Sequence, residues 1–180
     1  MAKQFDTLDP AHIRFIQAQH MYFTASAAPD GRVNVSPKGM DSLRVLDGNR
    51  IAWLSVTGSG NETAGHLLEH PRVTLMWCSF TTRPMILRTY GTARAIYPQD
   101  AEWKDLEGLF PNYRSARQIF DMSIDLVQTS CGYAVPFMDY QGERDTLQKW
   151  AADKSDDDLR AYKIEKNRKT IDGKTTGLPI

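Results

Sequence analysis

The sequence lacks the features that mark several common protein classes. It contains only two cysteines, Cys78 and Cys131, too few for the disulfide framework that stabilises small secreted domains. No apolar run approaches the roughly 20 residues that a membrane-spanning helix needs. The N-terminal residues also lack the hydrophobic segment of a signal peptide. We therefore expect a cytoplasmic protein without a membrane partner.

An excess of charge of either sign is absent as well, because 22 Lys and Arg side chains balance 22 Asp and Glu side chains. No global field attracts nucleic acid, and the aromatic residues lack the interleaved basic residues of a nucleic-acid-binding surface. We expect no nucleic-acid partner. The length of 180 residues fits one domain with its own core. We assign this domain to residues 1–168 and interpret residues 169–180 as a C-terminal arm or flexible tail.

The pattern of apolar residues predicts a mainly β protein with flanking helices. Alternating or β-forming runs predict strands at 21–27, 33–36, 43–46, 51–56, 73–77, 86–97 and 120–126. Helix formers and caps predict helices at 10–19, 61–70, 99–110, 145–153 and 155–166. The strands between residues 20 and 56 are too closely spaced for helical crossovers, which favours hairpins and a closed antiparallel barrel.

The stretch from Ile51 to Trp77 predicts a strand, a glycine-rich turn, a short helix and a second strand. Because the first N–H groups of a helix have no partner within it, the loop Thr57–Thr63 before this helix is a candidate anion site. A structural alternative stays open. Ser59 and Glu62 match a capping box, and Asn61 is itself a good N-cap.

Two cations are candidates for holding a phosphate near this loop. Lys38 follows the Ser-Pro that ends one predicted strand, and Arg88 lies within the apolar part of another. A strand arginine that points inward needs an acidic or phosphate partner. Either residue can equally face water, so neither is specific by itself.

Two further patterns have simpler explanations. His66 and His70 fit the H-x-x-E-H spacing of some zinc peptidases, but a proline follows at once and no further ligand helix stands out. We interpret both as helix-end residues and predict no metal site. Cys131 has no activating base nearby in the sequence, so we interpret it as a buried or interface cysteine rather than a nucleophile.

Several segments together resemble the pyridoxamine 5′-phosphate oxidase-like family of FMN-binding split barrels. They are Pro29–Gly39, Asn61–Ala64, His70–Val73 and the Arg88-x-x-Gly91 pair. More closely, VSPKGMDS, TGSGNETAGHL and QTSCGYAVP are similar to a bacterial subgroup related to that oxidase. The resemblance implies a six-stranded antiparallel split β-barrel. It also implies a homodimer with FMN in clefts between the subunits, and a small-molecule substrate or electron donor.

The resemblance also implies site residues. The family's FMN-lining segment, which ends in a phosphate-binding lysine, falls on Val33–Lys38. Its Ser-Arg-Lys phosphate triplet falls on Asn61, Glu62 and Thr63. This replacement removes two positive charges, which Lys38 or Arg88 could restore. The implied cofactor-binding set is Val33, Asn34, Val35, Ser36, Lys38, Val56, Thr57, Asn61, Glu62, Thr63 and Arg88.

The function implied is that of an FMN-binding, flavin-dependent oxidoreductase with no evident catalytic residue. The oxidase's C-terminal Trp is followed by Arg-Leu-x-x-Arg. This chain has Trp150 without that motif, so vitamin B6 oxidation does not carry over and the substrate stays open. The alternatives are a non-catalytic flavin- or haem-binding module and a deazaflavin-dependent reductase. The segment Cys131–Tyr133 is the expected contribution of a second subunit.

Overall fold

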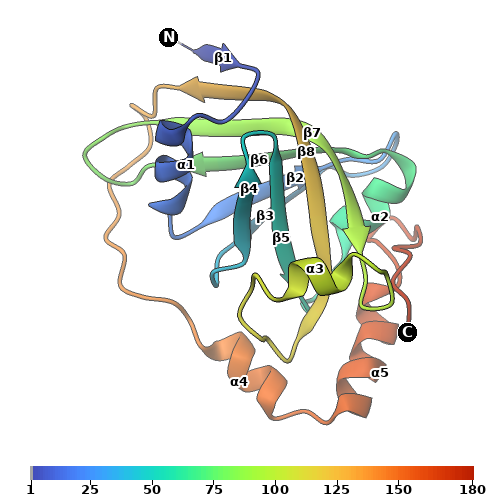
Figure 1. The fold of residues 1–180 in the computed structure, drawn as a ribbon. Coiled ribbons are helices and arrows are strands. Elements are labelled where there is room, and N and C mark those ends of the chain that lie inside the picture. Colours follow the sequence, from blue (N-terminus) through green and yellow to red (C-terminus); the bar gives the residue numbers. More distant parts are fainter. Residues whose placement is uncertain (1) are drawn as a thin grey trace.

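The computed structural model describes residues 2–180 as a curved antiparallel sheet with helices around it (Figure 1). Its strands are β1 (Lys3–Phe5), β2 (Tyr22–Ser26), β3 (Asn34–Lys38), β4 (Leu43–Asp47), β5 (Arg50–Val56), β6 (Arg72–Cys78), β7 (Ile86–Ile96) and β8 (Ala116–Ser130). Its helices are α1 (Pro10–Gln17), α2 (Glu62–Glu69), α3 (Trp103–Glu107), α4 (Thr146–Ala152) and α5 (Asp156–Asn167). Across these residues, no helix is both long enough and apolar enough to cross a bilayer.

Between residues 2 and 180 the sheet has eight strands, in the order β3-β2-β6-β7-β8-β5-β4, with β1 attached to β8. The expected count of six is therefore wrong. β8 is long enough to pair with two strands along one of its edges. Its first half pairs with β5, and its residues 127–129 pair with β1. β1 is short and polar, so its sequence carries no strand pattern. It is a strand because β8 offers it unpaired backbone groups.

The barrel is split between β3 and β4, the two ends of the strand order. Only residues 39–42 connect them, which keeps the two edges near each other without a shared ladder. The predicted split β-barrel is confirmed. Pro37 does not end β3 as predicted but pairs with Phe23 inside it. An edge strand accepts proline because the missing N–H lies on the side without a partner.

The core lies on both faces of the central strands. Ile51 and Trp53 of β5 belong to the main cluster inside the barrel, whereas Ala52 and Leu54 belong to a second cluster beneath α3. Because successive side chains of a strand point to opposite faces, β5 is buried on both sides. Its sequence is accordingly apolar from Ile51 to Leu54 rather than alternating.

The C-terminal part of the chain is anchored to the barrel. The Asn167 side chain, at the end of α5, is fully buried and donates to the Gly58 carbonyl at 2.8 Å. The Thr176 hydroxyl then donates to the Asn167 carbonyl at 2.6 Å, and the Tyr97 hydroxyl donates to the Thr176 carbonyl at 3.2 Å. Figure 1 shows α5 and the tail returning toward α2. Residues 169–180 thus lie against the loop that begins α2.

Candidate functional site

A cavity of about 910 Å³ lies where β3, the end of β5, the loop before α2 and α5 meet. One wall is the segment 32–38 and another is the loop 58–63. The remaining lining residues are Trp53, Ser55, Val56, Arg117, Phe120, Glu165, Lys166, Lys169, Thr170 and Ile171. The cavity therefore joins the split in the barrel to the C-terminal helix and tail.

The loop before α2 leaves the start of that helix without a side-chain cap. Neither Ser59 nor Asn61 caps it, so the capping interpretation of this loop is wrong. The Asn61 side chain turns inward instead, where its Oδ1 accepts from Gln118 Nε2 at 2.6 Å. Thr63 lies in the cavity wall, and its hydroxyl oxygen accepts from Asn34 Nδ2 at 3.3 Å. The first N–H groups of α2 are therefore still available to an anion.

Arg117 of β8 is the most unusual side chain of the cavity. It is only 5% exposed, yet within residues 2–180 it forms no ion pair with a carboxylate. Its Nη1 donates to the Gly60 carbonyl and its Nη2 to Ser55 Oγ, both at 3.0 Å. Its Nε has no hydrogen-bond partner. Burial lowers the pKa of the guanidinium to about 10, because leaving water disfavours the charged form.

Two lysines add positive charge around Arg117. Burial lowers the pKa of Lys38 on β3, and the charge of Arg117 lowers it further. Lys163 of α5 has a lowered pKa for the same two reasons, and its Nζ donates to the Ala116 carbonyl at 3.4 Å. Among residues 2–180, no carboxylate offsets either lysine. Buried cations without acidic partners are unfavourable alone and are stabilised by a bound anion.

The two acidic side chains of the cavity are already engaged. Both carboxylate oxygens of Glu62 accept from the Ile171 backbone N–H, at 3.2 and 3.1 Å. Glu165 forms an ion pair with Lys166 at 2.6 Å. Glu62 therefore links the tail to the start of α2.

The structure brings most of the implied cofactor-binding residues to this one cavity. Those that line it are Val33, Asn34, Val35, Ser36, Lys38, Val56, Asn61, Glu62 and Thr63. Thr57 does not line it, because its side chain is fully buried and donates to the Ser115 carbonyl at 3.0 Å. Arg88 does not line it either, because its Nη1 donates to Ser130 Oγ at 3.3 Å, at the other end of β8.

The histidines and Cys131 lie away from the cavity. His66 is buried, and its Nδ1 is 3.1 Å from Ser26 Oγ, whereas Nδ1 of His70 accepts from Arg72 Nε. Residues 2–180 contain no cluster of three or more His, Cys, Asp or Glu side chains arranged to hold a metal ion. Cys131 is exposed, so the expectation of a buried cysteine is wrong for the single chain.

Sequence reasoning missed Arg117, because it started the last strand at Phe120. The strand begins at Ala116, and Arg117 is buried where the pairing of β8 with β5 shifts by one residue. Residues 117–120 are all buried, so no alternating pattern marks this part of the strand. The contribution of α5 carried no such signal, because its contacts depend on the tertiary fold.

A family model described as pyridoxamine 5′-phosphate oxidase matches residues 8–131. The chain belongs to the pyridoxamine 5′-phosphate oxidase family. The resemblance drawn from the motifs is thereby confirmed. The family match ends before α4, so α5 and the tail, which supply Lys163, Lys166 and Lys169, lie outside it.

One curated relative is the pyridoxamine 5′-phosphate oxidase family protein ustO of Aspergillus flavus. It is 37% identical, and the alignment covers 71% of this chain and 53% of ustO. The chain thus spans about half the length of this relative.

Solved structures support the fold. HupZ of Group A Streptococcus has a TM-score of 0.54 at 16% identity, over 68% of this chain and 98% of that chain. A Clostridium acetobutylicum protein related to general stress protein 26 has a TM-score of 0.53 at 9% identity, over 76% of this chain and 94% of that chain. At these identities the similarity shows the split-barrel fold alone.

Proposed function

We propose that the chain binds FMN in the cavity of about 910 Å³ and acts as a flavin-dependent oxidoreductase. The observation that carries this proposal is Arg117, a buried guanidinium with an unpartnered Nε and no carboxylate in contact. A phosphate group carries negative charge and several strong acceptor oxygens, which is what such a side chain requires. The volume lies within the roughly 300–1,000 Å³ range of small-molecule sites.

The donors of the site fit the two parts of FMN. Lys38 and Arg117 hold the phosphate, together with the Thr63 hydroxyl and the uncapped N–H groups at the start of α2. The segment Val33–Ser36 and Val56 form the wall along the isoalloxazine ring. When bound, the flavin supplies two-electron or hydride chemistry, while the protein binds and orients it.

The cavity mouth supports a homodimer in which a second chain closes the site. Val33 and Val35 on the edge strand β3 are 71% and 61% exposed, and both line the cavity. Apolar side chains at a ligand site are usually covered. A second copy placed over β3 would bury them and enclose the flavin. The loop Cys131–Tyr133, with Tyr133 at 84% exposure, is the proposed contact that the partner contributes.

Haem is the less favoured occupant of this cavity. None of the described residues that line it is a His, Cys, Met or Tyr, the side chains that commonly ligate haem iron. We therefore expect flavin rather than haem at this site.

The test begins with the absorbance of the purified protein and a titration with FMN. We expect bands of oxidised flavin that bleach with a nicotinamide donor and recover in air. A protein that stays colourless and ignores added FMN would contradict the proposal. A flavin that binds but is not repeatedly reduced and reoxidised would favour a non-catalytic flavin-binding module instead.

The double variant Lys38→Ala with Thr63→Ala tests the phosphate assignment separately. Loss of one charged and one neutral hydrogen bond should raise the Kd of FMN roughly 10- to 100-fold. Unchanged binding, with the fold intact by circular dichroism, would show that the phosphate lies elsewhere.

A further inference from the structure

A second cavity, of about 700 Å³, adjoins the first and shares with it a wall made by Pro37, Lys38, Gly58 and Ser59. The opposite wall comes from the loop before α4, from α4 itself and from α5. These elements follow residue 131, where the family match ends. This cavity is therefore built largely by a part of the chain that the family relationship does not describe.

Three aromatic side chains line the second cavity, namely Tyr140, Trp150 and Tyr162. Trp150 and Tyr162 meet edge to face with ring centroids 5.0 Å apart. The Tyr140 ring stacks on His20 at 3.6 Å with nearly parallel planes, which holds the loop against the segment after α1. Partly exposed rings around an open space favour a flat, apolar ligand that stacks on them and removes them from water.

The charges of this cavity favour a ligand that is also an anion. Lys38 lies on the shared wall, and Arg144 lines the side of the loop. Neither cation has an ion-pair partner between residues 2 and 180. Glu143 is the acidic side chain among the described lining residues, and its Oε1 accepts from the Tyr140 hydroxyl at 3.1 Å. Two cations against one carboxylate leave the lining with a net positive charge. A guanidinium such as that of Arg144 binds a carboxylate through two parallel hydrogen bonds.

We propose that the second cavity binds an aromatic carboxylate, with its ring against Trp150 and Tyr162 and its carboxylate at Arg144. The ligand lies across the wall at Lys38 and Gly58 from the phosphate end of the flavin cavity, so the two ligands bind as neighbours and share Lys38. This coupling rests on the proposed function, because it requires flavin in the first cavity. The binding site itself does not require flavin.

The probe is 2-naphthoate, with the neutral 2-naphthalenemethanol as its matched control. Titration calorimetry with FMN-free and FMN-loaded protein should show that the carboxylate binds at least about tenfold more tightly than the alcohol, because only the carboxylate pairs with Arg144. Naphthoate should also raise the Kd of FMN at least about twofold, since both anions draw on Lys38 at the shared wall. Equal affinity for acid and alcohol would overturn the proposal.

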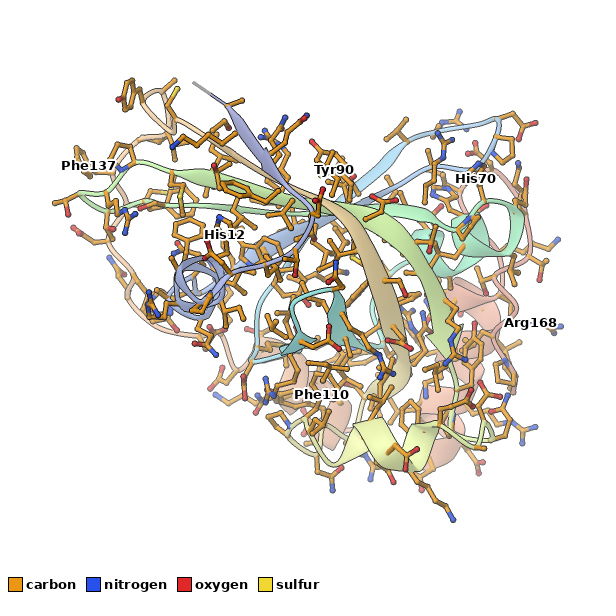
Figure 2. The ribbon with its side chains drawn as sticks, turned by 45° about the horizontal axis from the view of Figure 1, so that its top comes forward. His12, His70, Tyr90, Phe110, Phe137 and Arg168 are labelled. Atoms are coloured by element: carbon orange, nitrogen blue, oxygen red, sulfur yellow. The ribbon has the colours of Figure 1, made fainter. Side chains whose placement is uncertain are left out.

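Two variants locate the probe. Trp150→Ala should weaken naphthoate binding roughly tenfold by removing the stacking surface. Arg144→Gln should weaken it about tenfold as well but leave the alcohol unchanged. The controls are Phe137→Ala and Arg160→Gln, two exposed side chains that do not line the cavity. Phe137 projects from the edge of the molecule opposite His70 and Arg168 (Figure 2). If a folded Trp150→Ala variant binds naphthoate as tightly as the wild type, the probe binds at another place.

The outcomes separate the two proposals. If FMN binds and naphthoate does not, the second cavity is not this site, and the flavin proposal stands. If naphthoate binds in the predicted place but FMN does not, the flavin proposal fails and the coupling between the two sites fails with it. If both bind and the Kd of FMN is the same with and without naphthoate, the two ligands do not share Lys38 and the coupling is overturned.

Discussion

At the scale of single residues, Glu62 shows how one side chain can take a role different from that of its family counterpart. Its carboxylate accepts from the Ile171 N–H instead of opposing a phosphate. The cavity has a buried cation all the same, Arg117, which comes from β8 rather than from the loop. We propose that it supplies positive charge in place of the two cations that the family triplet would bring.

Replacing Glu62 by Gln tests this division of roles. Gln keeps an acceptor for Ile171 but removes a negative charge from the cavity wall. FMN should then bind about two- to tenfold more tightly, because the phosphate loses a repulsive neighbour. Glu62→Ala is the control, since it also removes the acceptor. An FMN titration that shows Glu62→Gln binding tenfold more weakly would mean that the carboxylate itself supports the cofactor.

The pH dependence of FMN binding follows from the lowered pKa values of Lys38 and Arg117. A bound phosphate favours the charged forms and raises both pKa values, so binding takes up protons at alkaline pH. FMN affinity should therefore fall as pH rises through the lowered pKa of Lys38 and toward about 10 for Arg117. Titrations from neutral pH upward, with riboflavin as the control without phosphate, measure this loss. A parallel loss for riboflavin would contradict the phosphate assignment.

The free protein should show the opposite trend in stability. Burial gives such a cation a lower pKa in the folded protein than in the unfolded chain. At a pH between these two pKa values the folded state binds fewer protons than the unfolded state, so the free energy of unfolding rises with pH. For Arg117 the window begins at about 10. Denaturant unfolding of the FMN-free protein should show this rise in wild type and less of it in Arg117→Gln.

At the scale of elements, α5 and the tail anchor the loop before α2 and the start of that helix. Asn167 joins the end of α5 to the Gly58 carbonyl, and Glu62 joins the start of α2 to the tail at Ile171. Lys163 and Lys166 come from the same helix. The loop before α2 is therefore held from the side that faces away from the barrel.

Asn167→Ala tests whether this hydrogen bond holds the loop in place. The substitution leaves the Gly58 carbonyl without its partner, which should destabilise the protein by roughly 1–3 kcal/mol and weaken FMN binding. Urea unfolding and FMN titration measure the two effects. The exposed Asn112 offers a matched control, and Asn112→Ala should change neither. Full FMN affinity in Asn167→Ala would show that the loop keeps its shape without α5.

At the scale of the whole molecule, local patterns in the sequence predicted most of the barrel but not everything that completes its cavity. The strands that carry regular apolar patterns, from β2 to β7, were predicted within a few residues. The first part of β8 was missed because Arg117 and Gln118 are buried polar residues, and such residues look like exposed ones in a sequence. Their partners at Gly60 and Asn61 lie 57 positions away.

The C-terminal region shows the same limit. The composition of residues 169–180 indicated an arm or a flexible tail, yet Thr176 is fully buried. Its order depends on contacts with Asn167 and Tyr97, which no local pattern reveals. The second cavity likewise depends on how the loop at Tyr140 and the helix at Trp150 fold back on the barrel.

The proposed function depends most on Arg117, a buried guanidinium without an ion-pair partner among residues 2–180, as the group that binds the phosphate of FMN. The most direct measurement is the Kd of FMN and of riboflavin for wild type, Arg117→Gln and the control Arg94→Gln, an exposed arginine on β7. Wild type and Arg94→Gln should prefer FMN strongly. Arg117→Gln should bind FMN roughly 10- to 100-fold more weakly and riboflavin almost unchanged. Equal affinities for FMN and riboflavin in the wild type, or an FMN preference that survives Arg117→Gln, would contradict the account.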